Sequence, residues 1–185
     1  MKEENDRMSE GTTGLIHICC GDGKGKTTSA MGLCLRAAGA GLRVVIYQFM
    51  KDGQANERTI LEKNPNVTFL NEVRSVCFSF RMSEAQKSRE QARYLTDLER
   101  VSEYVRREGA DVLLLDEALY AVSSRLLSEQ ILTEFLDQKP EKLEVILTGG
   151  AASGALMERA DYISRIVNEK HPFQRGIRAR EGIEY

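Results

Sequence analysis

Short apolar runs alternate with longer amphipathic stretches from Gly14 onward, and this alternation determines the expected fold. The apolar runs predict six strands, at residues 15–20, 43–49, 67–70, 111–116, 143–148 and 162–167. Runs with no polar interruption, such as Val112 to Leu115, are typical of central strands that helices cover on both faces. Because strands alternate with helical stretches, the pattern predicts parallel βαβ units. We therefore expect an α/β fold with three layers and a mostly parallel sheet.

The stretches between these strands predict helices with recognisable start and stop signals. Residues 26–40 are rich in Ala and Leu, and the stretch ends among glycines, which commonly stop helices. Residues 83–108 open with a serine, and apolar side chains at three- or four-residue spacing predict one buried face: Leu95, Leu98, Val101 and Val105. Residues 128–138 form a third predicted helix, and a short one follows Ser153. Ligands of such folds bind at the carboxyl ends of the strands.

Length and composition limit the classes of protein that this chain can be. At about 150 residues per domain, 185 residues predict one compact domain, which we place at residues 14–185. Hydrophobic residues make up 42% and charged residues 29%, as in ordinary globular proteins. The formal net charge of −2 lacks the basic excess of nucleic-acid-binding proteins. We therefore expect any bound polyanion to be small and held locally.

The remaining features predict a cytoplasmic protein with no membrane segment. The apolar runs are far shorter than the ~20 residues that a membrane helix needs. Residues 1–13 are polar and of mixed charge, so we expect a mobile tail and not a secretory signal. The four cysteines show no disulfide framework or zinc-ligand spacing and are expected to be small buried residues: Cys19, Cys20, Cys34 and Cys77.

The strongest chemical signal lies between the first strand and the first helix. The sequence there reads Cys20-Gly21-Asp22-Gly23-Lys24-Gly25-Lys26-Thr27-Thr28. This strand–loop–helix setting is the one that a Walker A phosphate loop requires. Glycines let backbone N–H groups point at phosphate oxygens, Lys26 is placed to reach the terminal phosphates, and Thr27 is placed to ligate Mg²⁺. Cys20 stands where the usual motif begins with glycine; the alternative interpretation is an ordinary Gly-rich turn.

A second element agrees with this phosphate loop. Leu113-Leu114-Leu115 is followed by Asp116 and Glu117, the form of a Walker B segment that holds Mg²⁺ directly or through water. The alternative is that the two acids only cap a helix that starts at Ala118. Together the two elements predict ATP with Mg²⁺ as the ligand. They leave the reaction open among a hydrolase, a kinase or another transferase, and a nucleotide-dependent binding or regulatory module.

Beyond these motifs, the chain resembles the P-loop ATP:corrinoid adenosyltransferases, the cob(I)alamin or cob(I)yrinic acid a,c-diamide adenosyltransferase family, from about Gly14 to Tyr185. The resemblance covers the phosphate loop with its non-glycine start and four further segments: Arg36-Ala37-Ala38-Gly39-Ala40-Gly41, Gln48-Phe49-Met50-Lys51 with Asn56-Glu57-Arg58, Leu115-Asp116-Glu117-Ala118-Leu119-Tyr120, and Leu147-Thr148-Gly149-Gly150. The tail, from His171-Pro172-Phe173-Gln174-Arg175-Gly176 to Gly182-Ile183-Glu184-Tyr185, is the most discriminating part. Generic P-loop kinases and ATPases do not share it.

This resemblance implies a P-loop NTPase (RecA-like) core that transfers the 5′-deoxyadenosyl group of ATP to the Co(I) of a reduced corrinoid and releases triphosphate. Residues 21–28 would hold the triphosphate with the help of Lys26, and Thr27, Asp116 and Glu117 would serve the metal, with Asp116 and Lys24 supporting the triphosphate. A generic P-loop phosphotransferase or ATPase is the alternative function.

The resemblance also implies how the corrinoid is prepared. Phe78 and Phe80 match family positions where aromatic side chains exclude the lower axial ligand of cobalt, which eases reduction to Co(I). Phe80 stands where the family has tryptophan, and the two could instead be same-face residues of a strand. A reductase that supplies the electron and a homodimer are implied partners, with no nucleic acid or membrane.

Other positions are open between surface and substrate-contacting roles: Arg36, Lys51, Asn56, Glu57 and residues 171–175. His171 is not expected to ligate cobalt, because the chemistry benefits from an open axial position. The choice of corrinoid, and of salvage or de novo synthesis, is not readable from the sequence.

Overall fold

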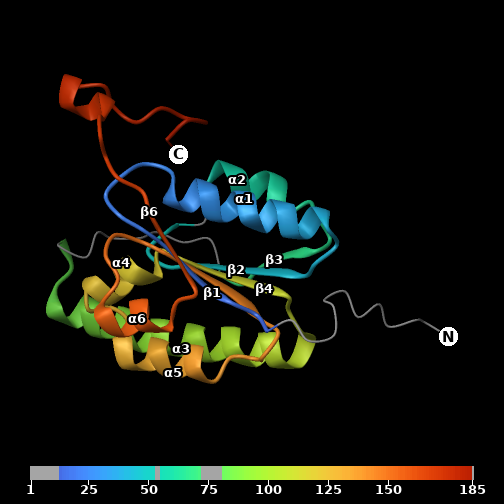
Figure 1. Ribbon diagram of the computed structural model, residues 1–185. Coiled ribbons are helices and arrows are strands. Elements are labelled where there is room, and N and C mark those ends of the chain that lie inside the picture. The colour runs from blue at the N-terminus through green and yellow to red at the C-terminus, as the bar shows by residue number, and fades with distance from the viewer. Residues whose placement is uncertain (1–12, 53–54, 72–80, 185) are drawn as a thin grey trace.

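A six-stranded parallel sheet forms the centre of the computed structural model, which describes residues 13–52, 55–71 and 81–184 (Figure 1). Its strands are β1 (Ile16–Cys20), β2 (Val44–Gln48), β3 (Val67–Phe69), β4 (Val112–Asp116), β5 (Glu144–Thr148) and β6 (Tyr162–Arg165). Their order is β3-β2-β4-β5-β1-β6, and every pairing between them is parallel. All six predicted strands are confirmed, and the sheet is parallel throughout the described chain.

Helices cover both faces of the sheet, which confirms the three layers (Figure 1). One face carries α1 (Lys26–Gly39) and α2 (Asn56–Leu61). The other carries α3 (Glu84–Glu108), α4 (Ala118–Ser123), α5 (Glu129–Asp137) and α6 (Gly154–Arg159). A 3₁₀ helix, η2 (Pro172–Arg175), follows in the C-terminal segment. Among the described residues, no helix is both long and apolar enough to cross a membrane.

The central strands are apolar on both sides because each face packs against helices. Alternate residues of β2, β4 and β5 join one core cluster with α3 and α5: Val45, Tyr47, Leu113, Leu115, Val145 and Leu147. The residues between them join a second cluster with α1: Val44, Ile46, Val112, Leu114 and Ile146. This two-residue period explains why the strand sequences read as continuous apolar runs.

The predicted helix starts rest on side-chain caps. Ser83 and Gln86 form a reciprocal capping box at the start of α3. Ser128 and Ser153 each accept a hydrogen bond from a backbone N–H three residues further on, at the starts of α5 and α6. The sequence does not predict α2 and η2, which have six and four residues. Unlike α6, which has the same length, α2 begins without a side-chain cap that could mark its start.

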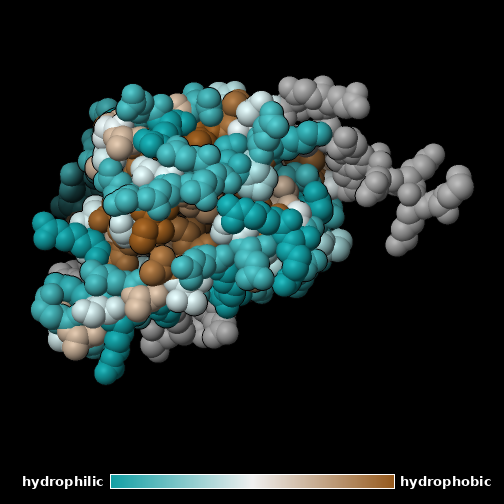
Figure 2. Space-filling view, turned by 90° about the horizontal axis from the view of Figure 1, so that it is seen from below, coloured by the Kyte–Doolittle hydropathy of each residue, from teal (hydrophilic) through white to brown (hydrophobic). Residues whose placement is uncertain are grey.

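One residue of the predicted buried face of α3 lies elsewhere. Tyr94, Leu98, Val101 and Val105 are buried, whereas Leu95 is 36% exposed. Leu95 lines a groove of about 670 Å³ between α3 and α5, together with Ile131 and Phe135. Figure 2 shows apolar side chains gathered in a hollow with polar rims on this side of the molecule. Three of the four predicted residues are therefore buried, and Tyr94 takes the place expected for Leu95.

We predict that Gly149→Ala destabilises the protein. Gly149 has a φ of 148°, and a Cβ there would lie 2.6 Å from the Leu119 Cβ and 2.8 Å from the Tyr120 backbone nitrogen. Strain and overpacking of this kind cost about 1–3 kcal/mol each. Thermal unfolding of the ligand-free variant should show a Tm that is lower by several degrees.

Gly32→Ala is the matched control, because a Cβ at this exposed position within α1 meets nothing within 4 Å. Helix propensity favours alanine there, so its Tm should stay level or rise. Equal Tm values for the two variants would contradict the close approach at Gly149.

Candidate functional site

The phosphate loop connects the carboxyl end of β1 to the start of α1, as predicted. Cys20 is the buried last residue of β1, so the chain needs no glycine there. A glycine is needed at the next position. Gly21 has a φ of 117°, and a Cβ there would lie 2.2 Å from the Ile166 carbonyl oxygen. The Gly21 N–H donates to the Gly150 carbonyl oxygen at 2.6 Å, and that of Gly23 donates to Ile166 at 2.9 Å. These bonds fix the first half of the loop against its neighbours.

The second half of the loop keeps its donors available for an anion. Within the described residues, no backbone hydrogen bond uses the N–H groups of residues 24–28, which surround the start of α1. Gly25 caps α1 without a side-chain hydrogen bond. A helix of 14 residues that begins with free N–H groups attracts negative charge. The Lys26 ammonium donates to the Gly23 carbonyl oxygen at 2.7 Å, so it lies over the same loop.

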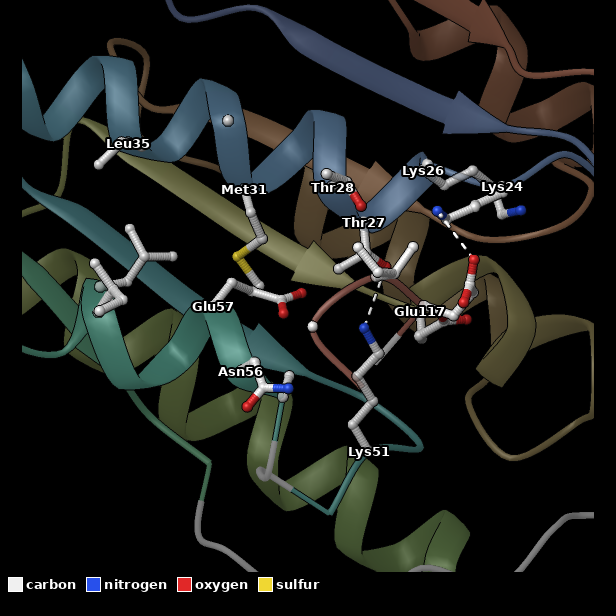
Figure 3. A pocket seen from close by; sticks show the side chains of 18 of the residues that line it. Lys24, Lys26, Thr27, Thr28, Met31, Leu35, Lys51, Asn56, Glu57 and Glu117 are labelled. Carbon is white, nitrogen blue, oxygen red and sulfur yellow. Dashed lines mark hydrogen bonds and ion pairs between the residues drawn. The ribbon is translucent and has the colours of Figure 1, made fainter. Parts of the chain in front are cut away.

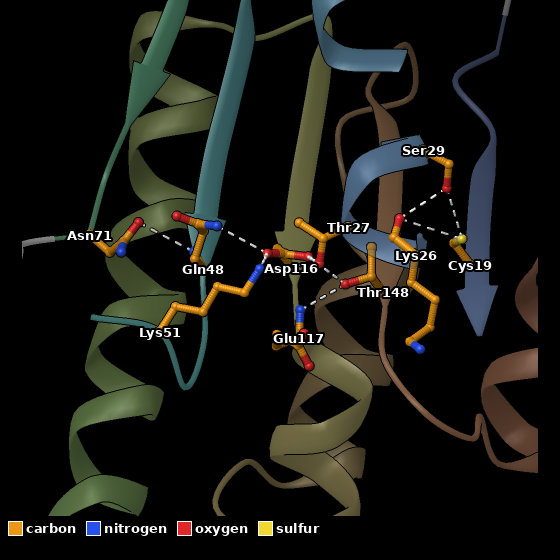
Figure 4. Close-up of polar contacts among 10 residues, drawn as sticks. All are labelled: Cys19, Lys26, Thr27, Ser29, Gln48, Lys51, Asn71, Asp116, Glu117 and Thr148. Carbon is orange, nitrogen blue, oxygen red and sulfur yellow. Dashed lines mark hydrogen bonds and ion pairs between the residues drawn. The ribbon is translucent and has the colours of Figure 1, made fainter. Parts of the chain in front are cut away.

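The carboxylate of Asp116 is fully buried at the end of β4 and receives four hydrogen bonds (Figure 4). Its Oδ1 accepts from the hydroxyls of Thr27 at 2.9 Å and Thr148 at 2.6 Å. Its Oδ2 accepts from the Gln48 amide at 3.0 Å and from the Lys51 ammonium at 2.7 Å. Four donors fill the usual capacity of a carboxylate. Asp116 thereby ties the first turn of α1 to the ends of β2, β4 and β5.

Glu117 is the second carboxylate and has a different environment. It adopts a left-handed backbone with a φ of 62°, and its N–H donates to the Thr148 hydroxyl at 2.8 Å. Burial raises the pKa of its carboxyl, and the neighbouring charge of Asp116 raises it further, while Lys51 and Lys26 oppose the shift. No hydrogen bond within the described residues satisfies this carboxylate, which faces the cavity described next.

A cavity of about 1220 Å³ opens beside the loop (Figure 3). Residues 23–28 form one wall and Glu117 another. Lys51, Asn56 and Glu57 enter from the segment after β2, and Met31 and Leu35 of α1 add apolar surface. This confirms a ligand-sized space at the carboxyl edge of the sheet. Its size and its mixture of lysines with apolar side chains suit a nucleoside triphosphate.

The C-terminal segment completes the cavity, since residues 181–184 also line it. The Lys24 ammonium lies 3.4 Å from a carboxylate oxygen of Glu184. Hydrogen bonds from the Arg180 side chain and backbone, and a weaker one from Lys24, lower the pKa of the Glu184 carboxyl to about 2. An anion on this segment therefore contacts the phosphate loop, more than 150 residues away in the chain.

The remaining predicted site residues do not all lie at the cavity. Phe78 and Phe80 lie outside the described residues. Arg36 is exposed near the end of α1 and does not line the cavity. His171 accepts a hydrogen bond from the Phe173 N–H at 3.2 Å and caps η2. Gln48 and Thr148 were not predicted as site residues; their signal is that each is the last, polar residue of a buried strand, as Asp116 is.

The geometry fits a triphosphate with a divalent cation. The Thr27 hydroxyl and the Asp116 and Glu117 carboxylates supply oxygen donors, which Mg²⁺ prefers. No cluster of three His, Cys, Asp or Glu side chains in the described chain could hold a metal by itself. Phosphate oxygens and water would therefore complete the coordination. No general base is positioned against a nucleophile by these contacts, so the fold alone leaves the reaction open.

Comparisons with known proteins show which relatives this chain resembles. One corrinoid adenosyltransferase, from Escherichia coli (strain K12), is 32% identical over 173 residues, which cover 93% of this chain and 86% of that protein. Another from a Sinorhizobium species is 31% identical over 180 residues, covering 93% and 80%. The corrinoid adenosyltransferase CobA of Salmonella typhimurium is 30% identical over 173 residues, covering 93% and 86%.

The fold has a solved counterpart as well. A KaiC-like protein from Pyrococcus horikoshii OT3 superposes with a TM-score of 0.56 at 17% identity, covering 86% of this chain and 75% of that one. This likeness supports the P-loop NTPase fold. Finally, the model of the family described as ATP:corrinoid adenosyltransferase BtuR/CobO/CobP matches residues 12–185. The chain therefore belongs to the ATP:corrinoid adenosyltransferase family.

Proposed function

We propose that this chain transfers the 5′-deoxyadenosyl group of ATP to the cobalt of a reduced corrinoid. The observation that carries the proposal is the family match over residues 12–185 together with a phosphate loop at the edge of a large cavity. In the reaction, Co(I) donates its electron pair to the 5′ carbon of ATP. The carbon–oxygen bond breaks, triphosphate departs with that bond's electrons, and the product contains a Co(III)–carbon bond.

The phosphate loop then serves a leaving group instead of a transferred phosphoryl group. Residues 21–28 would form the triphosphate site, in which the free backbone N–H groups of residues 24–28 bind the phosphate oxygens. Lys26 would neutralise charge that develops as the carbon–oxygen bond breaks. Lys24 would support the triphosphate from the loop's other side once its contact with Glu184 opens. Because cobalt is the nucleophile, the site needs no general base.

Mg²⁺ fits the oxygen donors of this site, with Thr27 and Glu117 as ligands and Asp116 beside them. When bound, it would offset the negative charge of the departing triphosphate. Asp116 already receives four hydrogen bonds. We therefore propose that its main role is to orient the Thr27 hydroxyl toward the cation. Glu117, which lacks such partners among the described residues, has a carboxylate available to the cavity.

The corrinoid assignments extend the family likeness to segments outside the described residues. Phe78 and Phe80 would lie beneath the corrin ring and exclude the lower axial ligand, which eases reduction of Co(II) to Co(I). A reductase would supply the electron in the cytoplasm. Either cobalamin or cobyrinic acid a,c-diamide would be the substrate. We further propose a homodimer of domains spanning residues 14–185, with the polar tail, residues 1–13, ordering over the bound corrinoid.

We predict that anaerobic incubation with ATP, Mg²⁺ and chemically reduced cobalamin yields equal amounts of triphosphate and adenosylcobalamin. The corrinoid absorption spectrum follows the cobalt–carbon product, and chromatography identifies the phosphate product. ADP and phosphate without a cobalt–carbon species would contradict the proposal and indicate an ATPase or phosphotransferase. Parallel reactions with cobyrinic acid a,c-diamide would rank the two corrinoids by kcat/KM.

We predict that Lys26→Ala lowers kcat/KM for ATP by roughly 10²–10³-fold, the usual effect of removing one group that stabilises developing charge. The comparison is Lys63→Ala, which removes an exposed lysine that does not line the cavity. Steady-state kinetics with pre-reduced cobalamin measure both. Similar activity of the two variants would place Lys26 outside the triphosphate site.

We predict that Phe80→Ala impairs the reaction that starts from Co(II) and largely spares the reaction that starts from Co(I). The reason is that a ligand-excluding side chain acts on reduction and not on the attack at carbon. Phe80→Trp, which restores the residue found in the family, should keep both activities. An equal loss from Co(II) and from Co(I) in Phe80→Ala would show that Phe80 is only a packing residue.

A further inference from the structure

Lys51 occupies a position between the two residues that define the cation site. Its ammonium lies 2.7 Å from the Asp116 Oδ2 and 3.1 Å from the Thr27 Oγ1 (Figures 3 and 4). These oxygens belong to the Walker B carboxylate and the Walker A hydroxyl, the groups expected to meet a divalent cation. A positive charge from the chain itself is therefore placed at that point.

The turn that carries Lys51 is fixed from two sides. Directly after β2, the Phe49 N–H donates to the Asp116 carbonyl oxygen at 2.9 Å. Met50 adopts a left-handed backbone with a φ of 53°, and its N–H donates to the hydroxyl of buried Tyr94 at 2.9 Å. Non-glycine residues adopt this backbone only where surrounding contacts hold it. The strained backbone at Met50 thus directs Lys51 back over the carboxyl edge of the sheet.

Because the Asp116 carboxylate is buried, it needs a positive charge beside it. The Asp116 side chain has no exposed surface, and an ionised carboxylate without a countercharge is costly in such an environment. The hydroxyls of Thr27 and Thr148 and the amide of Gln48 supply hydrogen bonds but no charge. Lys51 supplies the charge, whereas the Lys26 ammonium contacts the Gly23 carbonyl oxygen instead.

The Lys51 ammonium is also able to leave. Its side chain is 25% exposed and lines the cavity, so rotation about its own bonds carries the ammonium from Asp116 into that space. A divalent cation bound to Thr27 beside Asp116 would repel the ammonium at the distances observed. Both charges cannot occupy the position between the two oxygens.

We propose that Lys51 is a resident counter-ion of Asp116, which yields its place between Thr27 and Asp116 when a divalent cation binds there. Building on the proposed function, the released ammonium then reaches the triphosphate in the cavity as a third lysine, beside Lys24 and Lys26. Lys51 is thus a positioning residue that preserves the cation site in the empty protein and joins the nucleotide site in the loaded one.

The test measures thermal unfolding without nucleotide, in EDTA and in excess MgCl₂. In EDTA, Lys51→Met should lower the Tm by roughly 3–10 °C, because Asp116 loses its countercharge. Excess Mg²⁺ should recover at least half of this loss by taking the vacated place, whereas the wild-type Tm should hardly respond. Lys63→Met removes a lysine that has no contact with Asp116 and should behave like the wild type.

A second variant keeps the inference falsifiable if Lys51→Met folds poorly. Lys51→Met with Asp116→Asn removes both charges, so its Tm in EDTA should exceed that of Lys51→Met, and Mg²⁺ should no longer raise it. A Lys51→Met protein that responds to Mg²⁺ no more than the wild type would overturn the inference. A double variant that retains the Mg²⁺ response would overturn it as well.

These measurements separate the inference from the proposed function. Mg²⁺ rescue of Lys51→Met, combined with a wild-type protein that makes no adenosylcorrinoid, would refute the function and leave the counter-ion role standing. Adenosyl transfer by the wild type, with no Mg²⁺ effect on Lys51→Met, would refute only the counter-ion role.

Discussion

The buried carboxylate of Asp116 is the interaction on which the rest of the site depends. An ionised group with no exposed surface must receive hydrogen bonds and a countercharge from its own surroundings. Here the donors come from α1, β2, β5 and the turn after β2, through Thr27, Gln48, Thr148 and Lys51. One charge therefore sets the relative positions of four chain segments. The parallel sheet makes this possible because it brings the ends of those strands to one edge.

Backbone strain is concentrated at the same edge. Met50 and Glu117 follow the neighbouring strands β2 and β4 within two residues of their ends, and both have left-handed backbones. Each is held by a defined hydrogen bond, from Met50 to the Tyr94 hydroxyl and from Glu117 to that of Thr148. Packing that is strong enough to hold these conformations also keeps the two side chains that follow β2 and β4, Lys51 and Glu117, directed at one cavity.

The sequence was sufficient to predict the fold and the place of the phosphate loop between β1 and α1, for physical reasons. Apolar runs and serine caps are local signals, so the strands and the starts of α3, α5 and α6 could be read directly. The loop's glycines, with Lys26 and Thr27, form a local motif as well. The hydrogen bonds of Gln48 and Thr148 to Asp116 could not be predicted, since they join residues that are 68 and 32 positions apart in the chain, respectively.

Contacts of the C-terminal segment, residues 171–185, could not be predicted from the sequence either. Its likeness to a family marked it as informative, yet nothing in its composition placed Glu184 against Lys24 or His171 as the cap of η2. Such contacts depend on how the chain returns to the sheet edge after β6. Leu95 illustrates the smaller error: a helical period defines a stripe, and only packing decides which neighbour, here Tyr94, faces inward.

The burial of the cysteines has a consequence for their own reactivity. Cys19, Cys20 and Cys34 are all buried and unpaired, and burial, with the nearby charge of Asp116, raises the pKa of the Cys34 thiol to about 12. Since the thiolate is the form that reacts, Cys34 stays protonated and inert at neutral pH. Oxidation and alkylation of the sulfur, which require the thiolate, are therefore suppressed at Cys34 for as long as the core around it stays folded.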